Sequence, residues 1–277
     1  MSAISHIDLC FVIDCTNSMG PFIAAAQQQT QQILTELAQQ AGADVRCGVV
    51  GYRDHGHAGE VVDVLALSGG HDVVKAQLAR LVARADGNPD AAEAVFAGLV
   101  AAVGLRWRES AMKVIVLVGD APPHGCGAAE EPFPDRFAED PTGQTLHSIS
   151  AEIERNGITL YSLVMAPSVH PQYDQVTADS FGFLARSTGG VSALAGAGVG
   201  AITVLETLGR RAFGDLVVDR RVFEVITDAA ALPGAAAAGP APAPAPSQLT
   251  ELATTLKLDE GEVVAAIARL QKRKLVQ

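Results

Sequence analysis

The sequence has no stretch that resembles a signal peptide or a membrane-spanning helix. Its first residues carry no basic cluster, and the apolar run near the N-terminus is interrupted by Asp8 and Asp14. Later apolar stretches are interrupted by glycine, proline and charged residues. From these absences we expect a cytoplasmic protein that makes no membrane contact.

Cysteine is scarce, and no Cys-x-x-Cys pair occurs among the four cysteines. Cys10 and Cys47 lie inside apolar runs that predict buried strands. Together with the missing signal peptide, this pattern favours reduced, mostly buried thiols over disulfide bonds.

The sequence also lacks an excess of basic over acidic residues, and it lacks two common catalytic motifs. The formal net charge is −11, so the protein as a whole does not attract nucleic acid or anionic lipid. The sequence has no Gly-x-x-x-x-Gly-Lys-[Ser/Thr] loop for nucleotide phosphates and no Gly-x-Ser-x-Gly turn for a serine nucleophile. We therefore expect a protein that is not an enzyme, with a hydrolase as a weaker alternative.

What the sequence does contain is an alternation of strand-like and helix-like segments. Apolar runs predict the strands, and helical periodicity predicts the helices between them. The predicted strands are 7–13, 45–52, 60–67, 113–118, 158–165 and 191–194, and the predicted helices are 21–41, 71–84, 90–106, 144–156, 173–187 and 199–213. A short turn between the second and third strands predicts one antiparallel pair. The fold class is therefore α/β, a mostly parallel central sheet with one antiparallel edge strand and helices on both faces.

A change in composition predicts where this domain ends. Residues 229–247 are nearly all alanine, glycine and proline, which is typical of a semi-rigid linker. We predict one domain over 1–228, the linker over 229–247 and a small helical segment over 248–277. The last segment is too short to form a core alone, so we expect it to pack against another surface.

Oxygen-bearing side chains alternate in the loop that follows the first predicted strand. Asp14, Thr16 and Ser18 are two residues apart, so their oxygens can converge on one hard cation such as Mg²⁺. One loop does not fill the shell of such an ion, and a second acid should come from a neighbouring strand end. Asp120 directly follows the strand at 113–118 and is placed to supply it.

These motifs resemble those of the von Willebrand factor A (vWA) family over about residues 5–213. FVIDCTNSMG is similar to the family's metal-ion-dependent adhesion site, and VLVGDAPPHG is similar to its fourth strand and acidic loop. The nearest likeness is to the intracellular group related to vWA alpha-kinases. The resemblance implies a Rossmann-like vWA fold and an adaptor or scaffold that binds another protein through a divalent metal.

One position departs from the family pattern. The family usually supplies a threonine from its second metal loop, and here Asp90 occupies that place. A carboxylate there would add negative charge to the metal shell and make the ion less attractive to an incoming acid. The metal ligands implied by the resemblance are Asp14, Thr16, Ser18, Asp90 and Asp120, which would hold Mg²⁺, or alternatively Mn²⁺ or Ca²⁺.

The resemblance also suggests partners. An Asp or Glu of a protein partner would complete the metal shell, and an AAA+ ATPase or another component of a multi-protein system is a candidate by family analogy. Two other interpretations of the site remain open. The acidic residues are also common as turn and helix caps, and a soft-metal site of His55, His57, His124 and Cys126 is conceivable.

The C-terminal segment raises an alternative function. Its pattern is similar to part of a helix-turn-helix unit, which would make the protein a metal-regulated DNA-binding adaptor. Five basic and four acidic residues in 248–277 leave a net charge of only +1. Because that charge is small for DNA contact, we favour a docking helix pair and expect no nucleic-acid partner.

Overall fold

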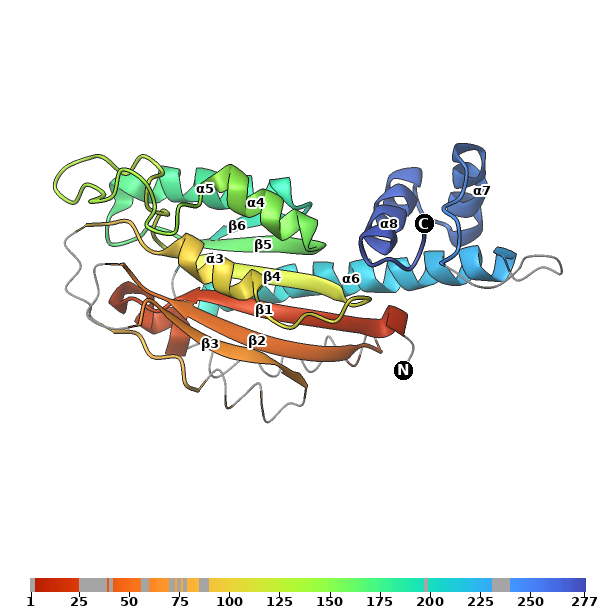
Figure 1. The fold of residues 1–277 in the computed structure, drawn as a ribbon, viewed down its shortest axis with the longest axis horizontal. Helices are drawn as coiled ribbons and strands as arrows, with labels where there is room; N and C mark the ends of the chain where they lie inside the picture. The colour runs from red at the N-terminus through yellow and green to blue at the C-terminus, as the bar shows by residue number, and fades with distance from the viewer. Residues whose placement is uncertain are drawn as a thin grey trace.

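The computed structural model describes residues 3–24, 39, 42–55, 60–69, 73, 76, 79–84, 90–196, 199–230 and 240–277. At its centre lies a six-stranded sheet with the strand order β3-β2-β1-β4-β5-β6 (Figure 1). The strands are β1 (His6–Asp14), β2 (Asp44–Tyr52), β3 (Val62–Gly69), β4 (Met112–Gly119), β5 (Ile158–Met165) and β6 (Ser192–Ala195). Only the β2–β3 pair is antiparallel among these strands, which confirms the predicted fold class.

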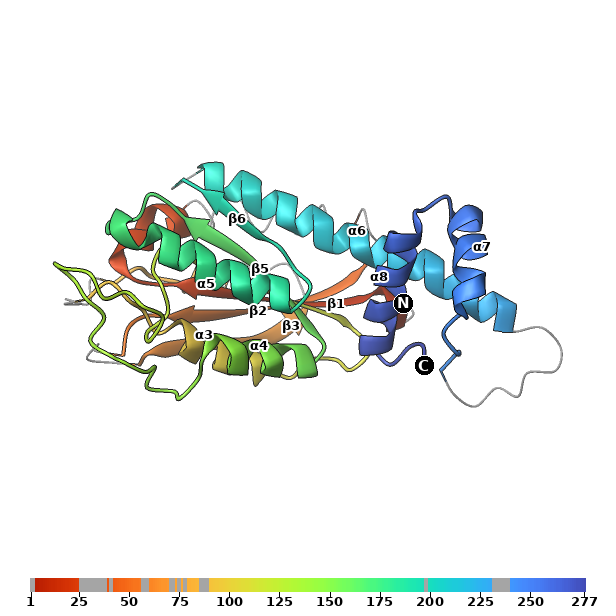
Figure 2. The ribbon, with the colours of Figure 1, turned by 90° about the horizontal axis from the view of Figure 1, so that it is seen from above.

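The central strand β1 is buried on both faces because helices cover each side of the sheet. Cys10 and Val12 face a layer formed by α3 (Val95–Val103), α4 (Leu146–Arg155) and α5 (Asp174–Ser187). Phe11 and Ile13 point to the opposite face, where the long helix α6 (Val199–Ala230) packs. Figure 2 shows α6 on the other side of the sheet from α3 and α4. This continuous burial explains why the strand is an uninterrupted apolar run in the sequence.

Local signals fix the ends of some predicted helices. Thr145 caps α4 by accepting a hydrogen bond from the Ser148 backbone N–H at 3.1 Å, and the chain turns after it at Gly157, which has a φ of 68°. The helix predicted over 90–106 is shorter than expected. Its first residues are held in a loop because the Glu93 backbone N–H donates to Pro122 O at 2.9 Å and that of Ala94 donates to Arg53 O at 2.9 Å.

Two other predicted helices lie largely outside the described residues. Of the helix expected over 21–41, residues 21–24 and 39 are described and are helical. The helix expected over 71–84 does not reach its predicted end, because residues 81–84 are not helical. There the Arg84 backbone N–H donates to Cys15 O at 3.0 Å, so a contact between loops replaces the last helical turn.

The helix α6 extends well past its expected end near residue 213. Its final turns carry Val222 and Ile226, which form a core with the terminal helices α7 (Pro246–Leu256) and α8 (Glu260–Lys272). From the last two helices this core buries Leu252, Leu256, Val263, Ile267 and Leu270. The terminal segment therefore packs on α6, as its small size required.

Buried ion pairs reinforce this packing. The Asp219 carboxylate of α6 is fully buried and accepts hydrogen bonds from Arg269 at 2.8 Å and Arg273 at 3.5 Å. The guanidinium of Arg273 also donates to Ile4 O at 2.8 Å. Because each charge is paired, burial does not leave an isolated ion in the interior.

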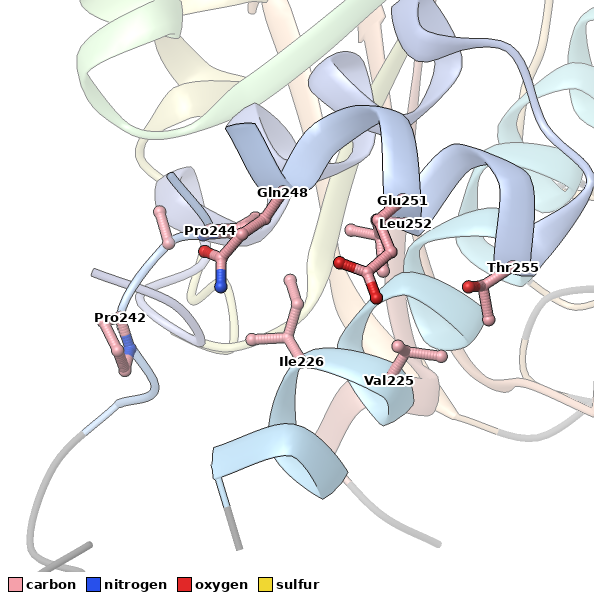
Figure 3. Close-up of a pocket in the computed structure, with 9 residues that line it drawn as sticks. Val225, Ile226, Pro242, Pro244, Gln248, Glu251, Leu252 and Thr255 are labelled. Carbon is pink, nitrogen blue, oxygen red and sulfur yellow. The ribbon is translucent and has the colours of Figure 1, made fainter. Parts of the chain in front are cut away.

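The residues before α7 also take part in the packing. A short parallel bridge joins Ala241 to Val276, and a pocket of about 410 Å³ remains between the end of α6 and the start of α7 (Figure 3). Val225, Ile226 and Leu252 are among the residues that line it. None of the helices in the described part of the chain is long and apolar enough to span a bilayer.

The packing of α8 generates a stability prediction. Leu270 is fully buried, so Leu270→Ala should lower the free energy of unfolding by about 2–5 kcal/mol. Val264 lies on the same helix but is 49% exposed, so Val264→Ala is the matched control and should change it by under about 1 kcal/mol. Urea denaturation measures both. Equal, small effects would contradict the docking of α8.

Candidate metal centre

The carboxyl ends of β1 and β4 lie side by side where the strand order reverses. The chain runs from β1 to β2 on one side, and β4 lies on the other side of β1. Such a reversal is where open α/β sheets bind ligands. Asp14 is the last residue of β1, and Asp120 directly follows β4. Gly119 allows this close approach, because a Cβ there would lie 3.4 Å from the Asp14 Cβ and would collide with the Tyr52 hydroxyl.

Hydrogen bonds bring the three oxygen-bearing side chains of the first loop together. Asp14 Oδ1 accepts from the Thr16 backbone N–H at 2.8 Å and from the Thr16 hydroxyl at 2.6 Å. The hydroxyl oxygens of Thr16 and Ser18 are 3.1 Å apart. Thr16 precedes a short 3₁₀ turn, η2 (Asn17–Met19), which curves the chain so that alternate side chains converge. The structure thus brings together Asp14, Thr16 and Ser18.

The other carboxylate oxygen of Asp14 is exceptional. The side chain is fully buried, yet Oδ2 has no hydrogen-bond partner among the described residues. Asp8, on the same strand, is equally buried but accepts from Arg46 at 3.0 Å and from Arg108 at 2.8 Å. A buried carboxylate normally needs such a partner. The lack of a partner for Asp14 Oδ2 among the described residues fits a site that a cation completes.

Asp120 adds a second carboxylate to the same place. Burial and the negative charge of Asp120 raise the pKa of Asp14 well above its usual range. Burial also raises the pKa of Asp120, although hydrogen bonding from the Ser18 hydroxyl opposes this rise. The charge of Asp120 disfavours ionisation of Asp14, and a divalent ion between the two carboxyl groups would offset the negative charge of both.

The predicted ligands open onto a shared pocket of about 270 Å³. Thr16, Ser18, Asp90 and Asp120 all line it, and Asp14 lies buried beneath the same loop. Sequence reasoning missed the other polar members of the wall, which are Asn17, Glu93, Tyr173, Ser168 and His170. The last two follow the end of β5, so the rule that ligands gather at carboxyl strand ends would have pointed to them.

Asp90 lies in the wall but is turned toward a different set of groups. Its Oδ2 accepts from the Arg136 backbone N–H at 2.9 Å, and its Oδ1 has no hydrogen-bond partner in the described residues. The charged groups that act on it are Asp54, His124 and Asp135. No hydrogen bond in the described residues joins Asp90 to Asp14 or Asp120.

Among the described residues of the alternative soft-metal set, His55, His124 and Cys126 do not form one cluster of potential ligands. His57 lies outside the described residues. His55 approaches Asp140, with Nε2 at 3.7 Å from Oδ2, whereas His124 lies between Asp54 and Asp135. The ring centroids of His55 and His124 are 5.5 Å apart, and the neighbours of each ring are carboxylates.

Comparison with known proteins supports the fold. No protein-family model matches the chain. The alpha-protein kinase vwkA of Dictyostelium discoideum is 27% identical over 160 residues, which is 56% of this chain and 24% of the kinase. The pilus adhesin SpaC from Lactobacillus rhamnosus GG has a similar structure, with a TM-score of 0.55 and 16% identity over 77% of this chain and 31% of the adhesin.

A von Willebrand factor type A protein from Catenulispora acidiphila gives a TM-score of 0.53 at 17% identity, covering 76% of this chain and 43% of that one. The chain thus spans less than half the length of each of these proteins. Its fold is the Rossmann-like vWA fold, as the sequence resemblance implied.

The pKa shifts at the two carboxyl groups predict a pH dependence for the metal-free protein. Because the folded state raises the pKa of Asp14, it favours the protonated form, whereas the unfolded chain ionises near pH 3.9. The contribution of the protonated Asp14 carboxyl group to the free energy of unfolding is therefore complete below that pH. It is lost as the pH rises toward the folded-state pKa of Asp14.

With chelator present, unfolding free energy measured by urea denaturation should therefore fall as pH rises from 4 to 8. Asp14→Asn, which cannot ionise, should flatten this dependence. The exposed acid Asp179 provides the matched variant, Asp179→Asn, which should keep the wild-type slope. Parallel slopes for all three proteins would contradict the assignment.

Proposed function

We propose that this protein is a non-enzymatic interaction module that binds another protein through a divalent cation at the sheet edge. The observation that carries the proposal is the buried Oδ2 of Asp14, which has no hydrogen-bond partner in the described part of the chain and lies close to the carboxylate of Asp120. Asp14 and Asp120 supply carboxylate oxygens, and Thr16 and Ser18 supply hydroxyl oxygens. This all-oxygen set suits Mg²⁺, with Mn²⁺ or Ca²⁺ as substitutes.

The ion would contribute a positive centre with a coordination position open to a carboxylate of the partner. The pocket around Thr16, Ser18 and Asp120 exposes this position, and the residues after β5 form its opposite wall. Asp90 contributes negative charge to the pocket, directly or through water, and so weakens the attraction of the ion for an acidic partner. The hydroxyl of Ser18 contacts Thr16 and Asp120, which supports a ligand role over a nucleophilic one.

Similarity of fold to an adhesin supports a role in adhesion or assembly. SpaC, which has a similar fold over 31% of its length, is a pilus adhesin. We propose a cytoplasmic adaptor or scaffold whose partner is a protein with an exposed Asp or Glu. An AAA+ ATPase is one candidate of that kind.

The terminal helices fit a docking role better than DNA contact. Arg269 and Arg273 pair with the buried Asp219. Lys274 pairs with Glu109 at 2.5 Å, and Lys272 lies 3.9 Å from Glu154. Internal pairing of these four basic side chains leaves little charge for phosphates, because nucleic-acid binding depends on a concentrated basic surface.

Calorimetric titration with Mg²⁺ tests the metal site. The wild-type protein should bind Mg²⁺, and Asp14→Ala should abolish measurable binding, because it removes the buried carboxylate. Asp179→Ala removes an equal charge from an exposed position on α5 and should leave the affinity unchanged within about twofold. Equal Mg²⁺ affinity for Asp14→Ala and wild type would overturn the proposal.

Affinity capture tests the partner role. Immobilised wild-type protein should retain a specific protein in Mg²⁺ and release it in chelator, and Asp14→Ala should not retain it. The Asp179→Ala column should retain the same protein as the wild type. If the column retained the same proteins with and without chelator, the binding would not depend on the ion.

A further inference from the structure

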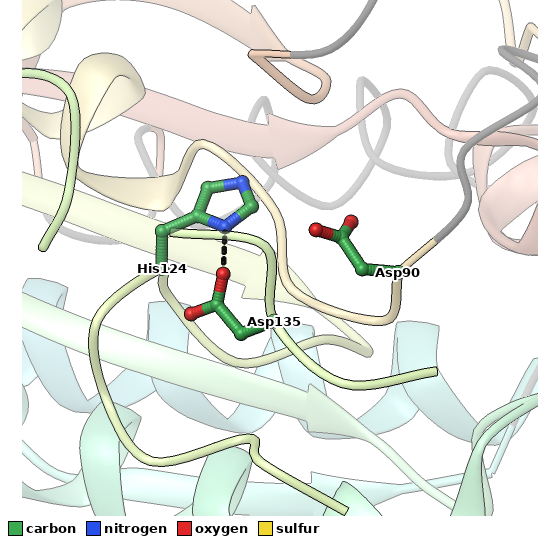
Figure 4. Close-up of side chains that lie close together, drawn as sticks. All are labelled: Asp90, His124 and Asp135. Atoms are coloured by element: carbon green, nitrogen blue, oxygen red, sulfur yellow. Dashed lines mark hydrogen bonds and ion pairs between the residues drawn. The ribbon is translucent and has the colours of Figure 1, made fainter. Parts of the chain in front are cut away.

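A second group of potential metal ligands lies next to the first pocket. His124 and Asp135 come from the loop between β4 and α4, and Asp90 precedes α3. One ligand atom from each lies within 4.8 Å of the other two. Figure 4 shows the Asp90 carboxylate pointing toward the imidazole, with Asp135 beside the same ring.

The hydrogen bonds of His124 orient its ring. Nε2 lies 2.5 Å from Asp54 Oδ1, and Nδ1 lies 2.8 Å from Asp135 Oδ1. His124 is fully buried. A neutral imidazole carries a single N–H, so when Nε2 donates to Asp54, the lone pair of Nδ1 faces a carboxylate. A cation between Nδ1 and Asp135, either a proton or a metal ion, removes this repulsion.

The surroundings of Asp90 favour a metal ion over a proton at this place. It is only 4% exposed, and its Oδ1 has no hydrogen-bond partner in the described part of the chain. A proton on His124 satisfies Asp135 but leaves this oxygen buried and unpaired. A metal ion would contact the imidazole nitrogen and both carboxylates together, so it satisfies every group that faces the cluster.

The surroundings also suit a cation. Burial raises the pKa of Asp90, and the negative charges of Asp54 and Asp135 raise it further. The edge of the Phe137 ring packs against His124 at a centroid distance of 4.8 Å, at an angle of 80°. This low-dielectric cover strengthens the attraction between the carboxylates and any ion they hold.

We propose that His124, Asp135 and Asp90 bind a second divalent ion, of the borderline class represented by Zn²⁺. One imidazole nitrogen with two carboxylates is a donor set that Zn²⁺ accepts and that differs from the all-oxygen set at Asp14. Asp54 does not bind the ion but holds His124 in the tautomer that presents Nδ1, as carboxylates often do behind metal-binding histidines.

This second site does not depend on the first. Among the residues named here, Asp90 belongs to both, since it lines the first pocket while its carboxylate points toward His124 (Figure 4). An ion at the second site would link the segment before α3 to the β4–α4 loop. It would thereby fix the wall against which a partner of the first site packs.

The test uses the full chain carrying Asp14→Ala, so that the first site contributes nothing. After removal of bound metal, this protein should bind one equivalent of Zn²⁺ by calorimetry, and Co²⁺ should give visible absorption bands typical of nitrogen and oxygen ligation. Adding Asp90→Asn, whose amide oxygen can still accept from Arg136, should weaken Zn²⁺ binding by at least about 100-fold. Asp54→Asn should weaken it by about 10–100-fold.

Glu139→Gln is the matched control, because Glu139 is an exposed acid in the same loop and should leave the affinity unchanged. If Asp90→Asn does not fold, as judged by circular dichroism, Asp135→Asn replaces it with the same expected loss. Absence of Zn²⁺ binding in the Asp14→Ala protein would overturn the second site, as would equal affinities for Asp90→Asn and Glu139→Gln.

Discussion

The site depends on one constraint, which is that a buried carboxylate needs a positive partner. Asp8 and Asp219 meet this need with arginine side chains and hold the sheet and the terminal helices together. Asp14 is just as buried, but the hydrogen bonds that it accepts from the described residues all reach Oδ1. The same kind of residue is therefore paired with arginine in two places, whereas in the third one of its oxygens has no hydrogen-bond partner among the described residues.

The fold was predictable because buried strands can be recognised in the sequence as continuous apolar runs. All six strands were expected within two residues of their ends. The strands β1, β4 and β5 are buried along nearly their whole length, and a short continuous apolar run is typical of a strand buried on both faces. The end of α6 was missed because charged residues such as Asp219 and Arg220 interrupt its apolar face. Asp219 is buried there because Arg269 and Arg273, fifty or more residues later, neutralise it.

The candidate site was predictable in part for a similar reason. Alternation within one loop brought Asp14, Thr16 and Ser18 together, and the strand-end rule placed Asp120 beside them. The surroundings of Asp90 were not predictable. They depend on how the long loop after β4 returns to place His124 and Asp135 near it, and loop paths are set by tertiary contacts that local sequence does not encode.

The helix α6 runs from the sheet to the terminal helices, and its length has a mechanical consequence. At about 1.5 Å per residue, its 32 residues extend roughly 48 Å. Its first half packs under the sheet, and its second half carries α7 and α8 (Figure 2). Arg273, directly after α8, also donates to Ile4 O and Ser110 O at the start of the sheet. The helix pair is therefore held to the sheet at two places, so a tilt of α6 would have to break contacts at its far end.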